Sequence, residues 1–335
     1  MSDSSDKRPT LRTLAEITGL GISTVSQALR DSPDIAIETR KRVQLAAQQA
    51  GYRPNRAGVR LRTGKSNVIS LVLNAEDAED GGSGFFANMV YGISDALKGT
   101  PYHLVVTPHS LSDPMEPIRY IVETNSADGV IISRTQPDDP RVRYLVENKM
   151  PFATHGRTDT GIEHAYFDFD NESCAYESLR LLHQRGRKHA ALIGPPSQLT
   201  YFHHTLNGFN RGLSDFGMSG FLLSEVDSDS RIPDLIKAGL SLAQLRDRPD
   251  AIVCVSSSMA LAVIAGLKQG GMELGRDYDL VAKPMTEMIG LSQPGIIGID
   301  ESFLKAGYEL ARMVMARIAG TEPSVLQMLD APKQS

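Results

Sequence analysis

Short runs of β-branched and apolar residues alternate with longer, helix-like stretches over most of this 335-residue chain. Each run is short enough to be a buried strand, and each intervening stretch is long enough for a helix. Because consecutive parallel strands need a helical crossover, this alternation favours a parallel, doubly wound α/β sheet. The runs are VISLVL at 68, YHLVVT at 102, DGVIIS at 128, AALIG at 190, DAIVCV at 250 and YDLVAK at 278.

The alternation passes through two cycles, one before and one after about residue 160. A chain of this length exceeds what one hydrophobic core usually organises, so two or three domains are expected. We therefore predict two similar subdomains, the first over about 66–160 and the second over about 161–290.

Charge is distributed unevenly between the two ends of the chain. Residues 1–65 contain 12 Lys and Arg against 6 Asp and Glu, whereas residues 66–335 contain 23 against 34. A basic head on an acidic body indicates a polyanionic partner for the head alone, although a solvated basic surface would give the same totals.

The head has the apolar spacing of three short helices. Thr10 is a good N-cap for the first helix, because its hydroxyl can accept a hydrogen bond from a first-turn N–H. Gly19 and Gly21 supply a tight turn before a second helix of about nine residues. A third helix is expected over 38–50, with Gly51 as its C-cap. The periodic residues are Leu11, Leu14, Ala15 and Thr18, then Val25, Ala28 and Leu29, then Val43, Ala46, Ala47 and Ala50.

The face of the second helix opposite its apolar residues carries hydrogen-bonding side chains. At 100° per residue, this face holds Ser23, Ser26, Gln27 and Arg30. The major groove of DNA admits a helix and presents donors and acceptors on its base edges. The head therefore predicts double-stranded DNA as a partner.

An arginine-rich stretch over 53–65 follows the third helix. On composition alone it would be a flexible linker, but Arg and Lys at this density can neutralise phosphates. A short helix over 55–61 would project Leu61 from a polar surface. A leucine exposed beside arginines is a candidate wedge for the minor groove.

The strings TLRTLAEITGLGISTVSQALRD and TRKRVQLAAQQAGYRPNRAGVRLRTGKSNVISLVL closely resemble the amino-terminal signature of LacI/GalR-family transcriptional regulators. The resemblance continues over nearly the whole chain. It implies an all-α helix-turn-helix DNA-binding domain over 1–52, a hinge helix or linker over 53–65, and an effector-binding core over 66–335 that is similar to periplasmic sugar-binding proteins. It also implies that the segment after Pro294, over about 291–320, returns to the first subdomain.

In that family the second helix reads the operator and a hinge leucine enters the minor groove. Two positions depart from the family pattern, because Gly21 stands where Ser is usual and Gln27 where Arg is usual. Gln27 can pair with adenine but cannot form the arginine pair with guanine, so we expect a different operator at that base step. The expected DNA-binding residues are Thr10, Arg12, Ile22, Ser23, Thr24, Ser26, Gln27, Arg30, Thr39, Asn55, Gly58 and Leu61.

Ligands of such α/β folds bind beyond the carboxyl ends of the strands, between the two halves. The residues after the predicted strands are polar and aromatic, which suits stacking on a sugar and hydrogen bonding to its hydroxyls. Some of them would instead only cap helices. The expected effector-binding residues are Phe85, Phe86, Ser133, Arg134, His155, Arg157, Asp168, Tyr201, His204, Ser256 and Lys283.

Several of these positions differ from the usual family pattern. Thr205 precedes Gly208-Phe209 where the family usually has Arg, and most other standard effector contacts are also replaced. The strings HGRT and SRT and the Lys after DLVA are similar to the branch that controls α-glucoside and disaccharide use. This resemblance implies a small-molecule carbohydrate effector, a glucoside or a disaccharide such as sucrose. A corepressor-dependent regulator, or one that responds to a non-sugar metabolite, is the alternative.

Other classes of protein are disfavoured by what the sequence lacks. It has no nucleophile elbow, phosphate-binding loop or metal-ligand spacing, so we expect no catalytic residue, metal or cofactor. Cys174 and Cys254 lie in apolar stretches and are expected to be buried free thiols. A signal peptide and an 18-residue apolar run are absent, so we expect no membrane contact and a cytoplasmic, nucleoid-associated protein rather than a transport binding protein. The ending LDAPKQS adds no heptad helix, which favours a homodimer with two heads on a pseudo-palindromic operator.

Overall fold

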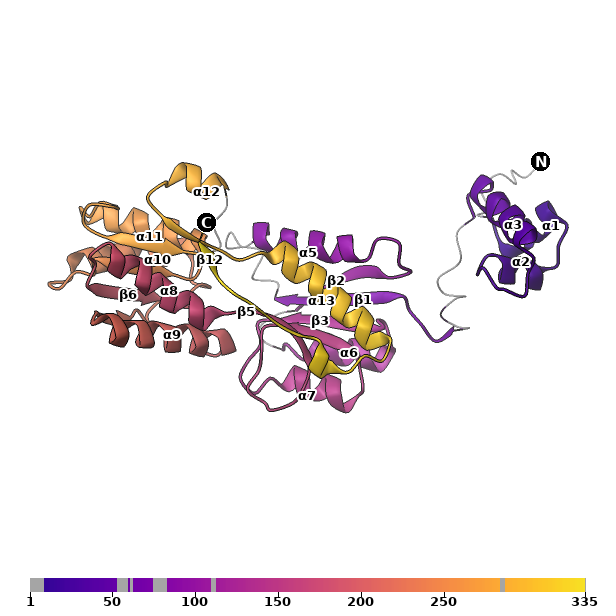
Figure 1. Ribbon diagram of the computed structural model, residues 1–335, viewed down its shortest axis with the longest axis horizontal. Helices are drawn as coiled ribbons and strands as arrows, with labels where there is room; N and C mark the ends of the chain where they lie inside the picture. Colours follow the sequence, from indigo (N-terminus) through magenta and orange to yellow (C-terminus); the bar gives the residue numbers. More distant parts are fainter. Residues whose placement is uncertain are drawn as a thin grey trace. The chain divides into compact units, whose positions relative to one another are not determined.

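The computed structural model describes residues 9–52, 60, 63–74, 83–109, 113–283 and 287–334, and the chain forms two compact units, 1–66 and 67–335 (Figure 1). We call the first unit the head and the second the core. Within the described residues, no helix combines the length and apolar character that crossing a membrane requires.

The head contains the three predicted helices, α1 (Leu11–Thr18), α2 (Ile22–Ala28) and α3 (Ile37–Gln49). They enclose a small apolar core made of Leu14, Val25, Ala28, Val43 and Ala47. The end of α3 differs slightly from the prediction, because its C-cap is Ala50. Gly51 is the next residue and takes the left-handed conformation, with φ +64°, that ends the helix.

Local side-chain chemistry fixes both ends of α1. Thr10 and Thr13 form a reciprocal capping box at its start, and Gly19 ends it in the left-handed conformation. Arg42 of α3 donates to the Thr18 carbonyl at 3.1 Å, so the last turn of α1 is held against α3. The turn between α1 and α2 is therefore fixed by the Gly19 cap and by the contact of α3 with the last turn of α1.

The core contains two six-stranded sheets, which confirms the predicted pair of doubly wound subdomains. All strand pairs are parallel except β10 with β12. The first sheet has the order β11 (Gln327–Asp330), β5 (Ala165–Phe169), β4 (Phe152–His155), β3 (Gly129–Ser133), β1 (Val68–Asn74) and β2 (His103–His109). The second has the order β12 (Lys333–Gln334), β10 (Ile297–Asp300), β9 (Asp279–Ala282), β8 (Ala251–Cys254), β6 (His189–Ile193) and β7 (Ser219–Leu222).

Apolar side chains fill both faces of each sheet, which is why the central strands read as continuous apolar runs. In β3, for example, Ile131 faces one apolar cluster while Val130 and Ile132 face another. The covering helices of the first sheet are α5 (Ser83–Ala96), α6 (Glu116–Thr124), α7 (Pro140–Glu147) and α13 (Phe303–Ile318), with a short 3₁₀ turn, η2 (Pro323–Val325). Those of the second half are α8 (Asn171–Gln184), α9 (Thr200–Phe216), α10 (Ile232–Gln244), α11 (Ser257–Gln269) and α12 (Glu287–Ser292).

Two strands, β5 and β10, do not lie in the subdomain that the predicted boundaries assign to them. Residues 161–290 were expected in the second subdomain, but β5 pairs with β4 in the first sheet. Residues 291–320 were expected in the first, but β10 pairs with β9 in the second, and only α13 returns. The chain thus passes between the halves after β5, after β10 and again between β11 and β12 (Figure 1). These memberships depend on long-range pairing, which local patterns do not encode.

Helices α5 and α13 cross at two glycines. A Cβ on Gly92 would lie 2.0 Å from the carbonyl oxygen of Leu304, and one on Gly307 would lie 2.1 Å from that of Met89. The two backbones therefore touch at this crossing, and neither site has room for a side chain.

We expect Gly307→Ala to lower the free energy of unfolding by about 1–3 kcal/mol, because the added methyl group forces two helix backbones apart. Urea unfolding of the purified protein measures the change. Gly290→Ala is the matched control, since a Cβ on Gly290 in α12 meets nothing within 4 Å. Equal effects of the two substitutions would contradict the close helix contact.

Candidate functional site

The outward face of α2 presents most of the residues predicted to read DNA. Ser23, Gln27 and Arg30 are exposed, and Ile22 has 49% of its surface exposed although it is a large apolar side chain. Thr24 and Ser26 are half-buried. Arg30 Nε donates to the Ser26 carbonyl at 2.9 Å, which holds the guanidinium beside the last turn of the helix.

The other predicted DNA contacts of the head lie at helix starts or beyond the described residues. Thr10 is exposed, although its hydroxyl already caps α1. Arg12 is exposed and lies 3.6 Å from Glu16, and Thr39 is half-buried in the first turn of α3. The structure describes neither the hinge helix expected over 55–61, apart from Arg60, nor the predicted contacts Asn55, Gly58 and Leu61.

In the core, an ion pair joins the two halves at the carboxyl ends of their strands. Arg134, directly after β3, bonds through both terminal guanidinium nitrogens to the carboxylate of Asp229, which lies between β7 and α10; one of these bonds is 3.1 Å long. Arg134 has the strained φ of +55°. Arg141 donates to the carbonyls of Ser133 and Arg134 at 3.0 and 2.9 Å, and its buried pair with Asp139 fixes that arrangement. The surrounding contacts thus hold Arg134 in a conformation that it would otherwise avoid.

A second contact between the halves involves the main chain of Thr135. Its carbonyl oxygen accepts hydrogen bonds from Thr200 N at 2.9 Å and Thr200 Oγ1 at 3.0 Å, at the start of α9. The Thr135 hydroxyl donates to the Arg157 carbonyl at 2.7 Å. A Cβ on Gly156 would lie 2.6 Å from that hydroxyl, so only glycine leaves room for this turn.

Arg157, Asp168 and His204 form a third contact, with Arg157 after β4, Asp168 in β5 and His204 in α9. Arg157 Nε donates to Asp168 Oδ2 at 2.7 Å, and a terminal guanidinium nitrogen lies 3.4 Å from His204 Nδ1. Burial, and then the charge of Arg157, lower the pKa of His204. A neutral imidazole beside a paired arginine suits hydrogen bonding to an uncharged group.

Lys283, which follows β9, is a deeply buried cation. Its Nζ donates to Asn171 Oδ1 at 2.6 Å and to Glu301 Oε2 at 2.8 Å, and lies 4.4 Å from the centre of the Phe169 ring. Burial lowers the pKa of Lys283, but the attraction of Glu301 and the smaller effects that follow it outweigh burial and leave the pKa raised. Lys283 is therefore charged at neutral pH.

His155 and Tyr201 complete the group. His155 stacks on Phe167 and tilts against Phe303, with ring centres 6.4 and 5.5 Å apart, and burial lowers its pKa. Burial disfavours the charged form of Tyr201 too, and therefore raises its pKa; the Tyr201 hydroxyl bonds to Ser228. The charges of Asp168, Glu301 and Lys283 also act on the pKa of His155. Those of Arg134, Asp229 and Lys283 act on the pKa of Tyr201. Seven of the predicted effector contacts thus belong to one cluster, which we call the cleft cluster: Arg134, His155, Arg157, Asp168, Tyr201, His204 and Lys283.

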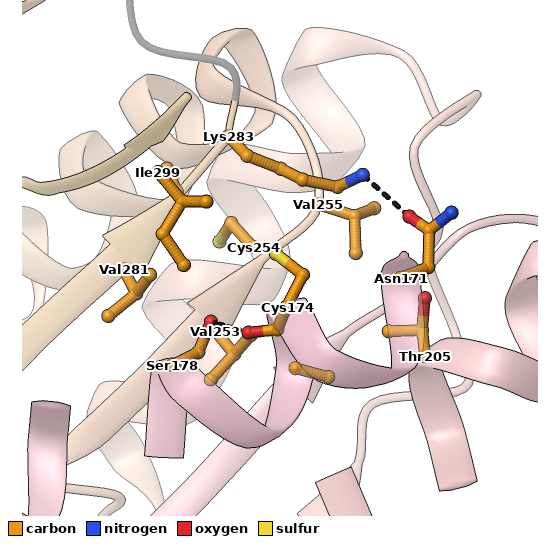
Figure 2. Close-up of a pocket in the computed structure, with 12 residues that line it drawn as sticks. Asn171, Cys174, Ser178, Thr205, Val253, Cys254, Val255, Val281, Lys283 and Ile299 are labelled. Carbon is orange, nitrogen blue, oxygen red and sulfur yellow. Dashed lines mark hydrogen bonds between the residues drawn. The ribbon is translucent and has the colours of Figure 1, made fainter. Parts of the chain in front are cut away.

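A small pocket lies beside this cluster, at the carboxyl ends of β8 and β9 and the first turns of α8 (Figure 2). Figure 2 shows the Lys283 side chain reaching over it toward Asn171, with Cys174, Cys254 and Thr205 among its walls. Its volume of about 10 Å³ is the space that one water molecule needs, so it does not hold a sugar. The two cysteines are buried free thiols, as predicted.

Four predicted effector contacts are not assigned to the cleft cluster. Phe86 is half-buried and packs against the first apolar core, and the Phe85 side chain lies outside the described residues. Ser133 is buried, with its carbonyl bonded to Arg141, and the Ser256 hydroxyl lies 2.8 Å from that of Ser258. Among the described contacts, no side-chain hydrogen bond or ion pair joins Phe86, Ser133 or Ser256 to the cluster, although Ser133 of β3 is paired with His155 of β4 in the first sheet.

Of the carboxylates that pair with the three cations, Asp168 was predicted as an effector contact, whereas Asp229 and Glu301 were not. Asp229 lies in the loop Asp-Ser-Asp-Ser, where nothing local separates it from Asp227. Glu301 directly follows a strand, as the predicted residues do, so the same rule could have found it. The described residues contain no group of three or more His, Cys, Asp or Glu side chains arranged to hold a metal ion.

Burial of His155 predicts a pH dependence of stability. Its pKa is lowered in the folded chain, so between the folded and unfolded pKa values the unfolded chain binds more protons. The stabilisation is complete above the unfolded value of about 6.5 and is lost as the pH falls below it. Urea unfolding from pH 7.5 to 5 should give a shallower slope for His155→Asn than for His103→Gln, which removes an exposed imidazole. Identical slopes would contradict this assignment.

Both units of the chain match known protein families. Residues 10–55 match the family described as "Bacterial regulatory proteins, lacI family", and residues 66–329 match "Periplasmic binding proteins and sugar binding domain of LacI family". The HTH-type transcriptional regulator AglR of Rhizobium meliloti is 32% identical over 333 residues, covering 97% of this chain and 90% of AglR. RafR of Escherichia coli, also an HTH-type transcriptional regulator, is 31% identical over 332 residues, covering 96% of each chain.

Solved structures share the fold. A complex of the transcriptional regulator CelR with cellobiose is 23% identical, covers 98% of each chain and gives a TM-score of 0.68. The lac repressor dimer bound to operator and the anti-inducer ONPF is 18% identical, again covers 98% of each chain and gives 0.81. Together with the family matches over both units, this similarity leads to one conclusion. The chain belongs to the LacI family of bacterial transcriptional regulators, with a helix-turn-helix DNA-binding head and a core of the family's sugar-binding type.

Proposed function

We propose that this sugar-responsive regulator is a repressor that binds a pseudo-palindromic operator as a homodimer and is released by a carbohydrate. The effector that we favour is a glucoside or a disaccharide such as sucrose. The observation that carries the proposal is the set of contacts between the two halves, because Arg134–Asp229 and Arg157–His204 lie where a ligand entering between the halves would meet them. We place its action in the cytoplasm, at the nucleoid.

On the DNA side, α2 supplies the base contacts. Ser23 and Gln27 are exposed on one face, and the exposed apolar Ile22 is suited to contact a thymine methyl group. Arg12 and Arg30 contact phosphates, as do Thr10, Thr24, Ser26 and Thr39 through their hydroxyls. By resemblance, Asn55, Gly58 and Leu61 act at the hinge, with Leu61 as the minor-groove wedge.

On the ligand side, sugar hydroxyls engage the cleft cluster. Sugar-bound and sugar-free states then differ in how the two halves are held, since each half supplies one partner of the contacts Arg134–Asp229, Thr135–Thr200 and Arg157–His204. A change of this kind is transmitted to the DNA-binding state through a coupling free energy of about 1–3 kcal/mol. Relatives support a sugar as the effector, since one solved relative is a complex with cellobiose and another is a probable maltose operon repressor.

The proposal is tested first on DNA. Repeated selection from a pool of random duplexes with the full-length protein should give a sequence with two-fold symmetry, and fluorescence anisotropy should show binding that weakens steeply with salt. Mono- and disaccharides are then added to the complex. Release by a sugar supports the proposal. Tighter binding with the sugar would indicate a corepressor, and release only by purines or amino acids would refute the sugar effector.

We expect Gln27→Ala to weaken binding to the selected duplex by about 5- to 150-fold, the loss associated with one bidentate base contact. Its affinity for unrelated DNA should hardly change, because Gln27 is uncharged. Gln48→Ala is the matched control, since Gln48 is exposed on α3. Anisotropy titrations measure all three proteins, and equal losses for both variants would exclude Gln27 as a base contact.

A further inference from the structure

Every cation of the cleft cluster is bonded to its own carboxylate. Arg134 pairs with Asp229, Arg157 with Asp168 at 2.7 Å, and Lys283 with Glu301 at 2.8 Å. The pairs differ in exposure: the Asp168 side chain is 5% exposed and that of Lys283 is 8% exposed, whereas Arg134 and Asp229 are 19% and 36% exposed. Salt screens the two buried pairs weakly, and in all three pairs a bonded carboxylate neutralises the cation locally.

The remaining groups of the cluster add no positive charge. His155 and His204 both have lowered pKa values because of burial, which keeps them neutral near pH 7. The first turn of α8, a position that attracts anions, is already occupied: the Asp170 carboxylate accepts from Ser173 N at 3.0 Å and from Ser173 Oγ at 2.7 Å.

The undescribed parts of the core add no basic side chain. The parts of the core outside the described residues, 75–82, 110–112, 284–286 and 335, contain no Lys or Arg. Residues 75–80, which follow β1, instead contain four carboxylates. No stretch of the core sequence therefore holds a further Lys or Arg that the structure leaves undescribed.

We infer that the cleft selects an uncharged sugar, without a phosphate or carboxylate group, and discriminates against phosphorylated sugars. This inference rests on the proposed sugar-responsive function and deepens it. A phosphate would lose its hydration beside cations that Asp229, Asp168 and Glu301 already neutralise, without gaining a free positive partner. Sugar hydroxyls both donate and accept, so they can bond to guanidinium N–H groups and to carboxylate oxygens without disturbing the pairs.

This selectivity places the sensed sugar in a sequence of reactions. The ligand must be supplied by a step that leaves its hydroxyls unmodified, such as transport without phosphorylation or hydrolysis of a larger glycoside. A kinase that phosphorylates the sugar would remove the ligand and end the signal. The regulator thus responds to the concentration of the sugar before it is phosphorylated.

Calorimetric titration of the full-length protein with paired ligands tests the inference. The pairs are sucrose, maltose, cellobiose and glucose, each with its 6-phosphate or 6′-phosphate ester. We expect at least one uncharged sugar to bind and its ester to bind at least about tenfold more weakly. An ester that binds as well as or better than its parent overturns the inference and leaves the sugar response intact. Failure of every sugar and ester to bind overturns both.

A charge-removing variant tests the cause. Asp229→Asn leaves Arg134 without its carboxylate and should reduce the discrimination against the ester several-fold. Asp138→Asn is the matched control, because it removes one carboxylate from the exposed Arg143–Asp138 pair in α7 and the preceding loop. Unchanged discrimination in Asp229→Asn, or the same reduction in Asp138→Asn, would show that pairing of the cleft cations does not set ligand charge.

Discussion

Replacing Lys283 by Met should lower the free energy of unfolding by about 3–5 kcal/mol, the usual cost of removing one partner from a buried ion pair. Methionine fills a similar volume but leaves the Glu301 carboxylate, whose side chain is 12% exposed, without its cation. It also removes the hydrogen bond that fixes Asn171 at the start of α8. Ligand binding should fall as well, because Lys283 belongs to the cleft cluster.

Urea unfolding of three proteins isolates this effect. The double variant Lys283→Met/Glu301→Gln removes both charges and should recover much of the lost stability, since no uncompensated charge remains. Lys305→Met is the matched control: its pair with Asp330 is more exposed, with 45% of the lysine side chain accessible, and should be worth about 1 kcal/mol or less. A Lys283→Met variant no less stable than Lys305→Met would refute the buried pair as a stabilising element.

The central architecture could be predicted because its signals are local. Buried parallel strands need continuous apolar runs, and β1, β3, β6, β8 and β9 all have them. The edge strand β7 is mostly half-buried, and β11 alternates between exposed and half-buried residues, so neither carries such a run. Pairing of β5 with β11 joins residues more than 150 positions apart, and no local pattern encodes that partnership.

The cleft could be predicted by residue type but not by partner. The rule that ligands bind after the carboxyl ends of strands indicated Arg134, Arg157 and Lys283, which now lie in one cluster. It did not indicate which carboxylate each cation meets. Asp229 reaches Arg134 only because the two halves face each other, and that arrangement is a property of the folded chain. The charge balance on which ligand selection depends was therefore invisible in the sequence.

The head offers the second large effect, because its apolar core is so small. Leu14 is fully buried and is one of five residues that form that core. Leu→Ala at such a site costs about 2–5 kcal/mol. A domain below about 70–80 residues rarely has more than about 3–5 kcal/mol of stability, so Leu14→Ala should unfold much of the head. Operator binding should be nearly abolished, because an unfolded α2 cannot enter the major groove.

Anisotropy on the selected duplex and calorimetry of sugar binding separate the two units. Leu45→Ala deletes the same atoms from a leucine that is 55% exposed on α3, so it should leave operator binding nearly intact. Both variants should bind sugar as the parent does, because Leu14 and Leu45 belong to the compact unit 1–66 and the cleft cluster belongs to 67–335. If Leu14→Ala instead impaired sugar binding to the same extent as operator binding, the two units would have to fold as one.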